Sequence, residues 1–292
     1  MTLLLGLIAA LCWGTTDLLA RFSGRGLGAY RAMFFAQLPA LAVMSVLLAA
    51  ERDAVAAVLA GAPIAAWVAG LLAAPLVLAA TLSLFRALTI GTIGIVSPVT
   101  ASYGAVTALL SAAAGEKLAP LTAAGIAVTV VGVALASAPA RAHPRGGSGR
   151  ADPLRGVGWA LLSAATYGFG LWLQGALAVP ALGSLVPVWL YYVTGVIGMA
   201  LLARPLRQSL APPPLRFWGV VLGSGLLGVS AYLAFAAGLA TGHVAVVTVL
   251  SSLSSGVTAL LGRLVLGERL SRHQWLGVAA ILLGIGLING AR

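Results

Sequence analysis

The chain has 292 residues, of which 61% are hydrophobic and only 8% are charged, and its mean hydropathy is +1.06. Soluble domains carry about 25% charged residues. Because so few polar side chains cannot cover the surface of a water-soluble domain, the composition excludes a soluble globular enzyme. It predicts an integral membrane protein, for which lipid is the solvent.

The charge is strongly unbalanced, with 17 Lys and Arg against 6 Asp and Glu and a net charge of +11. In a soluble chain this excess would suggest a nucleic-acid partner. Here the basic residues lie between apolar runs, as they do in the cytoplasmic loops of membrane proteins. We therefore expect membrane lipid and a small-molecule substrate as partners, no nucleic acid, and a monomer. The single cysteine, Cys12, excludes an intramolecular disulfide framework.

The charge-free windows predict ten membrane-spanning helices, because one helix needs about 20 apolar residues to cross the hydrocarbon layer. One span each is expected in 2–20, 32–50, 54–85, 87–115, 118–140 and 273–290, and two each in 156–203 and 217–262. Short turns within the two long windows are expected at 179–183 and at 240–243. No run alternates with the period of two that a membrane β-barrel requires, so the fold class is an all-α membrane protein.

The basic residues also predict an orientation, because alternate loops carry very different numbers of them. One side of the membrane collects Arg21, Arg25, Arg31, Arg86, Arg141, Arg145, Arg150, Arg155, Arg204, Arg207, Arg216, Arg263, Arg269 and Arg272, and the other collects Arg52, Lys117 and Arg292. The positive-inside rule places the first side in the cytoplasm. We expect a multi-pass protein of the bacterial inner membrane with both termini in the periplasm.

The two halves of the chain resemble each other. Residues 139–155 form a basic linker that separates an N-terminal unit, 1–138, from a C-terminal unit, 156–292. The sequence at 115–118, Gly-Glu-Lys-Leu, recurs as Gly-Glu-Arg-Leu at 267–270, and Trp13-Gly14 aligns with Tyr167-Gly168. Because each unit has five spans, the second enters the membrane from the opposite side. The sequence thus predicts two inverted five-helix repeats, which are typical of secondary transporters, although gene duplication in a structural protein leaves the same trace.

These features together resemble the drug/metabolite transporter superfamily, in its ten-helix, EamA-type metabolite exporter branch. The resemblance covers essentially the whole chain and depends on the five-plus-five spans, on Trp13-Gly14 late in the first helix, and on the repeated turn before the last helix of each half. Within that branch the sequence looks most like the aromatic amino acid exporters of bacterial inner membranes. The resemblance implies export of amino acids and related metabolites by alternating access.

Acidic residues that could couple transport to protons are scarce. The small multidrug members of the superfamily use a glutamate in the first helix, whereas the corresponding stretch here, 7–16, has no acid. Asp17 is expected about one turn from the end of the first helix, where it could pair with Arg21 or Arg86. This pattern favours a neutral or zwitterionic substrate over a lipophilic cation.

Uncharged polar and aromatic side chains in mid-span are the candidates for a substrate cavity, since such groups can bind a zwitterion with an apolar side chain. The candidates are Trp13, Gln37, Ser83, Ser102, Tyr103, Tyr167, Tyr191, Tyr232, Ser251, Ser252, Ser254 and Ser255. A lone serine in a membrane helix more often bonds to its own preceding turn. Pro75 and Pro98 are expected to kink their helices and to free carbonyl groups near the midplane.

No histidine, cysteine or glycine-rich motif of a known catalytic, metal or nucleotide site occurs, so we expect no catalytic residues, no metal and no cofactor. Two alternatives to an amino acid exporter stay open. A proton-coupled antiporter of drugs or quaternary cations would depend on Asp17. A membrane scaffold without transport activity would require a stable protein partner, and the shortness of the extramembrane segments argues against it.

Overall fold

The computed structural model of the chain describes residues 1–90, 99–100, 102–137, 156–266 and 272–290. Within these ranges the secondary structure is helical and no strand occurs. The first half contains α1 (Thr2–Leu27), α2 (Ala29–Ala50), α3 (Arg52–Gly61), α4 (Ile64–Ile90), α6 (Tyr103–Ala113) and α7 (Pro120–Ser137).

The second half begins with α8 (Val157–Leu173), which continues through a π-helical segment, η1 (Gln174–Ala178), into the short α9 (Val179–Leu182). The remaining helices are α10 (Leu185–Ala203), α11 (Leu215–Leu239), α12 (Val244–Ser251), α13 (Ser254–Leu266) and α14 (Arg272–Gly290). The prediction of an all-α fold is confirmed for the described residues.

Five helical segments in the described ranges are long and apolar enough to cross a membrane, namely Thr2–Gly24, Ala29–Ala50, Ile64–Leu84, Leu185–Ala203 and Leu215–Leu239. Shorter apolar helices occur at Pro120–Gly132, Val244–Thr258 and Trp275–Gly284. Large apolar side chains such as Leu72, Leu109 and Leu283 are exposed on the outside of the bundle. An aqueous surface would not favour so many exposed leucines, but hydrocarbon does.

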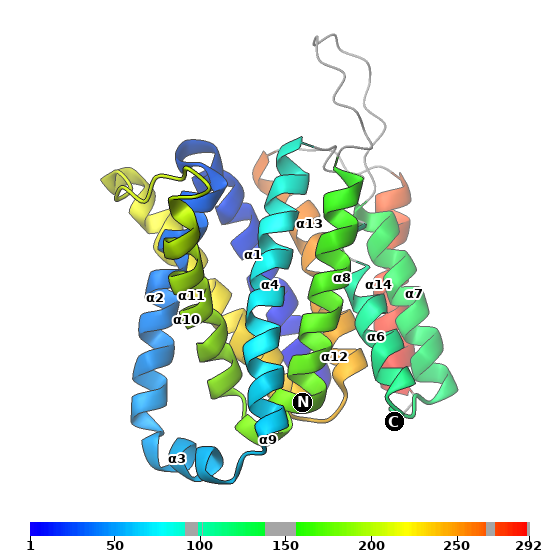
Figure 1. The fold of residues 1–292 in the computed structure, drawn as a ribbon. Coiled ribbons are helices and arrows are strands. Elements are labelled where there is room, and N and C mark those ends of the chain that lie inside the picture. The colour runs from blue at the N-terminus through cyan, green and yellow to red at the C-terminus, as the bar shows by residue number, and fades with distance from the viewer. Residues whose placement is uncertain (91–98, 101, 138–155, 267–271, 291–292) are drawn as a thin grey trace.

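The helices form one bundle whose long members run side by side, with α3 lying across one end (Figure 1). Because α1 begins and α14 ends at the end that carries α3, we call it the termini end. At the opposite end, here the α8 end, α1 ends and α8 begins. As a consequence, α1 and α8 run in opposite directions through the bundle.

Contacts between the two halves connect the helices of the bundle. The first helix of each half packs against helices of the other half: α1 against α11, α12 and α13, and α8 against α4 and α6. Three further pairs connect the halves, namely α7 with α14, α2 with α10, and α6 with α12. The largest buried apolar cluster lies in the middle of these contacts and contains Tyr103, Tyr191, Tyr232 and Phe235. The aromatic candidate site residues therefore lie on helices of both halves around one centre.

Several expected boundaries differ from the structure. The turn at 240–243 is confirmed, because α11 ends at Leu239 and α12 begins at Val244. The turn expected at 179–183 is wrong: the chain stays helical through Leu182 and turns at Gly183, whose φ is 71°. Pro180 lies directly after the π-helical segment η1, and the chain stays helical past it.

Candidate functional site

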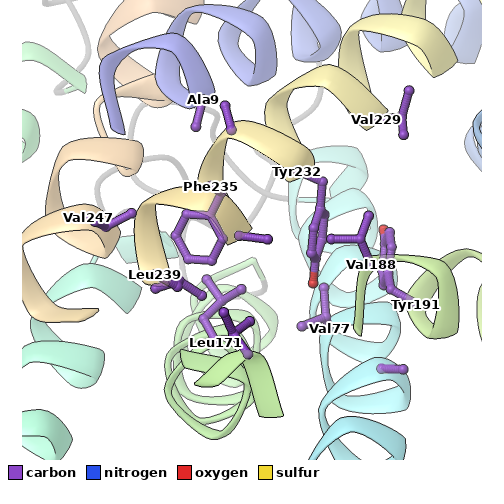
Figure 2. Close-up of a cluster of buried hydrophobic side chains, with 14 of the residues drawn as sticks. Ala9, Val77, Leu171, Val188, Tyr191, Val229, Tyr232, Phe235, Leu239 and Val247 are labelled. Atoms are coloured by element: carbon purple, nitrogen blue, oxygen red, sulfur yellow. The ribbon is translucent and has the colours of Figure 1, made fainter. Parts of the chain in front are cut away.

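Tyr191 of α10 and Tyr232 and Phe235 of α11 are aromatic members of the main buried apolar cluster (Figure 2). The ring of Tyr232 on α11 stacks on that of Tyr191 on α10, with centroids 4.8 Å apart and planes 19° apart. Trp13 on α1 contacts Tyr232 edge-on at 5.9 Å and Phe235 at 5.3 Å. Because offset stacks and edge-to-face pairs are the favoured aromatic geometries, this cluster holds its rings in defined orientations.

A second aromatic pair, on α6 and α8, also belongs to this cluster. Tyr103 at the start of α6 and Tyr167 on α8 have ring centroids 5.6 Å apart. The hydroxyl groups of Tyr167 and Thr81 are 2.6 Å apart and form a hydrogen bond. Trp13 and Tyr167, which the sequence alignment pairs, are each half-buried, whereas Tyr103 and Tyr191 are buried.

Gln174 is a central polar residue that the sequence reasoning missed. Its side chain is 1% exposed, and its Oε1 accepts a hydrogen bond of 2.9 Å from the hydroxyl of Tyr232. Gln174 begins the π-helical segment η1, and such segments often occur at functional sites. The signal was present, since Gln174 is an uncharged polar residue in an apolar window, but the turn expected at 179–183 placed it near a helix end.

Two helices are interrupted at serines near this centre. Between α12 and α13, the Oγ of Ser252 donates to the carbonyl of Val249 over 2.6 Å, and Ser102, just before α6, donates to that of Val99 over the same distance. The two interruptions lie against each other, because a Cβ added to Gly104 would come within 3.2 Å of the Ser252 Oγ.

Two interhelical hydrogen bonds link these interrupted helices to the first helix of the other half. Thr107 on α6 donates to the carbonyl of Gly168 on α8 over 2.9 Å, and Thr258 on α13 donates to the carbonyl of Gly14 on α1 over 3.2 Å. Both glycines are needed for the close approach. A Cβ at Gly168 would lie 3.0 Å from the carbonyl oxygen of Tyr103, and one at Gly14 would lie 2.8 Å from that of Ser254.

The other predicted site residues divide into central and peripheral ones. Ser251 is buried and donates to the carbonyl of its own preceding turn, at Thr248. Ser254 is also buried, whereas Ser255 is half-buried. The buried hydroxyl groups of Ser251 and Ser254 interact with that of Tyr103. These serines therefore make contacts both within their own helices and with the aromatic cluster.

Gln37 and Ser83 lie away from the aromatic cluster. Gln37 is buried between α2 and α10, where its Nε2 contacts the sulfur of Met199 at 3.2 Å and its Oε1 has no hydrogen-bond partner among the described residues. Ser83 is buried on α4. Of the two predicted kink positions, Pro75 lies inside α4, which continues past it, and Pro98 lies outside the described residues.

Comparison with known proteins identifies the family of this chain. The EamA-like transporter family matches residues 1–138 and again residues 154–290. This chain belongs to the EamA-like transporter family. The match agrees with the apolar helices and their exposed leucines, which indicate a multi-pass membrane protein.

Two further similarities agree with the EamA assignment. An uncharacterized transporter from the cobO 3′ region of a Sinorhizobium species is 37% identical over 93 residues, which are 32% of this chain and 66% of that relative, just under two thirds of its length. A protein of known crystal structure matches with a TM-score of 0.77 and 19% identity, covering 98% of this chain and 95% of the other. The second match shows a shared fold alone.

Asp17 does not lie where the sequence placed it. The helix expected over 2–20 continues to Leu27, so Asp17 is ten residues from its end and not one turn. The carboxylate lies 3.3 Å from the hydroxyl of Thr258, whose single proton is shared with the carbonyls of Ser254 at 2.8 Å and Gly14 at 3.2 Å. Of its two expected basic partners, Arg86 is exposed and makes no ion pair with it among the described side chains, and the side chain of Arg21 lies outside the described residues.

Proposed function

We propose that this EamA-family protein is a secondary exporter of amphipathic small metabolites, with aromatic amino acids as the preferred class, in a bacterial inner membrane. Two inverted five-helix repeats, 1–138 and 156–292, would rock around the central aromatic cluster and open it alternately to each side. The basic linker 139–155 and the α8 end would face the cytoplasm, and both termini the periplasm. The proposal includes a monomer that needs no cofactor.

The observation that carries this proposal is the pair of matched contacts on the two sides of the cluster. In the bond from Thr107 to Gly168 the first half donates to the first helix of the second half. In the bond from Thr258 to Gly14 the second half donates to the first helix of the first half. Val106 and Val257, each one residue before its threonine, are the side chains nearest to a Cβ added at the two glycines. Such exchange is what a two-fold axis between two copies of one unit produces.

The directions of the helices and the repeated family match support the same inverted arrangement. α1 and α8 run in opposite directions, and α7 packs against α14, the last helix of the other half (Figure 1). The family also matches the chain twice, with the break between 138 and 154. Two copies of opposite direction can each form the same gate on opposite sides of a membrane, which is the basis of alternating access.

The chemistry of the cluster favours an amphipathic solute with an aromatic side chain. Aromatic walls stack on such a ring, and hydroxyl and amide groups bind the polar part of the solute. The cluster offers both: the rings of Trp13 and Tyr167 are half-buried, and the hydroxyl groups of Thr81, Tyr232 and Ser254 lie near them.

Counterflow in proteoliposomes tests the proposal directly. We expect vesicles containing the purified protein and loaded with unlabelled phenylalanine to accumulate radiolabelled phenylalanine or tryptophan from outside, and to do so equally with and without a pH gradient. Loading with sucrose alone is the control. No accumulation above empty vesicles would exclude an aromatic amino acid exporter, and accumulation only with a proton gradient would favour the antiporter alternative.

Substitution of the repeat-related pair Trp13 and Tyr167 tests the site. We expect Trp13→Ala and Tyr167→Ala each to lower counterflow about tenfold or more, since each would remove an aromatic wall worth about 1 kcal/mol or more in stacking and apolar contact. Trp159→Ala is a matched control, because Trp159 is exposed on the outside of α8. If both cluster variants are folded and transport normally, the site is elsewhere.

A further inference from the structure

Asp17 is a charged side chain on the inward face of a membrane helix. Gly14, one turn earlier, packs against α13, and Trp13, four residues earlier, contacts Tyr232 and Phe235 on α11. Residues three and four apart share one helix face. The carboxylate itself reaches Thr258 on α13. Asp17 therefore points toward the centre and not toward lipid.

In spite of this inward position, the side chain of Asp17 is exposed. A carboxylate at bilayer depth is costly, at least about 2.5 kcal/mol, and such groups face the interior or water and commonly mark a substrate or ion pathway. Thr258, its neighbour on α13, is only half-buried. Asp17 and Thr258 thus lie at an accessible edge of the bundle, between α1 and α13.

The equivalent position in the other half is closed and apolar. The alignment of Trp13-Gly14 with Tyr167-Gly168 pairs Asp17 with Leu171, which is 2% exposed and belongs to the central apolar cluster. Thr107, the counterpart of Thr258, is fully buried. Of these two equivalent positions, only that of Asp17 carries an acid. Asp17 lies beyond the middle of α1 toward the α8 end (Figure 1), which is the side that the basic loops predict to be cytoplasmic.

We infer that Asp17 binds the ammonium group of the transported solute on the cytoplasmic side of the cluster, so that the substrate class is small aromatic amines and amino acids. This inference rests on the proposed transport function and adds the group that is recognised. A carboxylate one helical turn from Trp13 can pair with an ammonium while the ring of the same solute lies against the indole. Charge-assisted hydrogen bonds of this kind are shorter and stronger than neutral ones. Leu171 offers no such partner on the other side, which favours release there.

Three phenyl compounds separate the contribution of the ammonium group. Phenylalanine, phenethylamine and 3-phenylpropionate share a ring and a short chain but carry both charges, only the ammonium, or only the carboxylate. In proteoliposomes with the wild-type protein, we expect phenethylamine to inhibit phenylalanine counterflow and 3-phenylpropionate to inhibit it at least tenfold more weakly. In Asp17→Asn, KM for phenylalanine should rise at least about tenfold, equivalent to about 1.4 kcal/mol, and inhibition by phenethylamine should weaken in parallel.

Controls keep folding and function apart. Asp17→Glu keeps the charge and should retain inhibition by phenethylamine, and Arg86→Gln should leave KM unchanged, because Arg86 is exposed and makes no ion pair with Asp17 among the described side chains. Each variant is checked for a single symmetric peak in size-exclusion chromatography. An unchanged KM in Asp17→Asn, equal inhibition by 3-phenylpropionate, or a loss in Arg86→Gln as large as that in Asp17→Asn would overturn the inference. If the wild type transports phenethylamine but not phenylalanine, the amino acid proposal fails and the ammonium site stands; if it transports neither, both fail.

Discussion

Gly168→Ala is expected to destabilise the protein by about 1 to 3 kcal/mol, the usual cost of overpacking a filled interior, and to abolish most of the transport. The added methyl group would meet the side chain of Val106 and lie 3.0 Å from the carbonyl oxygen of Tyr103. To make room, α6 must move away from α8. That movement stretches the 2.9 Å hydrogen bond from Thr107 to the carbonyl of Gly168, one of the two matched contacts on which the proposed mechanism depends.

Gly158 on the same helix provides the matched control. A Cβ at Gly158 has no heavy atom within 4 Å, and alanine is a better helix former than glycine by about 1 kcal/mol. Gly158→Ala should therefore keep or raise the midpoint of thermal unfolding in detergent, whereas Gly168→Ala should lower it. Gly14→Ala should resemble Gly168→Ala, because its position in the other half is equivalent. Equal midpoints for the Gly158 and Gly168 variants would contradict the close helix packing.

Composition and hydropathy were sufficient to predict the fold class, because a chain with so few charges satisfies its backbone in lipid either by helices or by a closed barrel, and the alternation of a barrel is missing. The positions of the helix ends were harder. α1 continues to Leu27 through Asp17, Arg21 and Arg25, residues at which a hydropathy window ends. A helix needs apolar residues only while it is inside the hydrocarbon, so its hydrogen-bonded turns can continue into polar surroundings. This difference placed Asp17 wrongly.

The candidate site could be predicted in its aromatic members but not in their partners. Trp13 and Tyr167 stood out because they are equivalent positions of the proposed repeats, and Tyr191 and Tyr232 because tyrosine is rare in mid-span. Gln174 was missed because it preceded an expected turn. Which hydroxyl groups point to the centre depends on the rotation and crossing of the helices, and a single sequence does not contain that information.

Serines illustrate the same limit. The group at 251–255 was predicted to line a cavity because it covers a wide arc of one helix. The structure instead interrupts the helix within the group, and the hydroxyl groups of Ser251 and Ser252 bond to carbonyls of their own preceding turn. A hydroxyl that bonds back to the chain competes with the regular helix ladder. A group of serines in a membrane helix can therefore either line a cavity or interrupt the helix, and the sequence pattern is the same for both.

Tyr232→Ala is expected to have the largest effect of any single substitution in the cluster. Tyr232 is 4% exposed and its ring contacts those of Trp13, Tyr191, Tyr192 and Phe235. Removing a large buried aromatic side chain costs about 3 to 5 kcal/mol. The variant also leaves the buried Oε1 of Gln174 without the donor that it has in the wild type. We expect a large fall in the thermal unfolding midpoint and no measurable counterflow.

Tyr232→Phe separates the hydroxyl from the ring. It keeps the aromatic contacts but removes the donor to Gln174, and an unsatisfied buried acceptor costs about 1 to 3 kcal/mol. The double variant Tyr232→Phe with Gln174→Leu removes both polar partners, so it should recover much of that stability. If transport returns with stability in the double variant, the hydrogen bond serves only the fold. If stability returns but counterflow stays low, the polar pair itself binds the solute, since the aromatic cluster is then intact and only its hydrogen-bonding groups are missing.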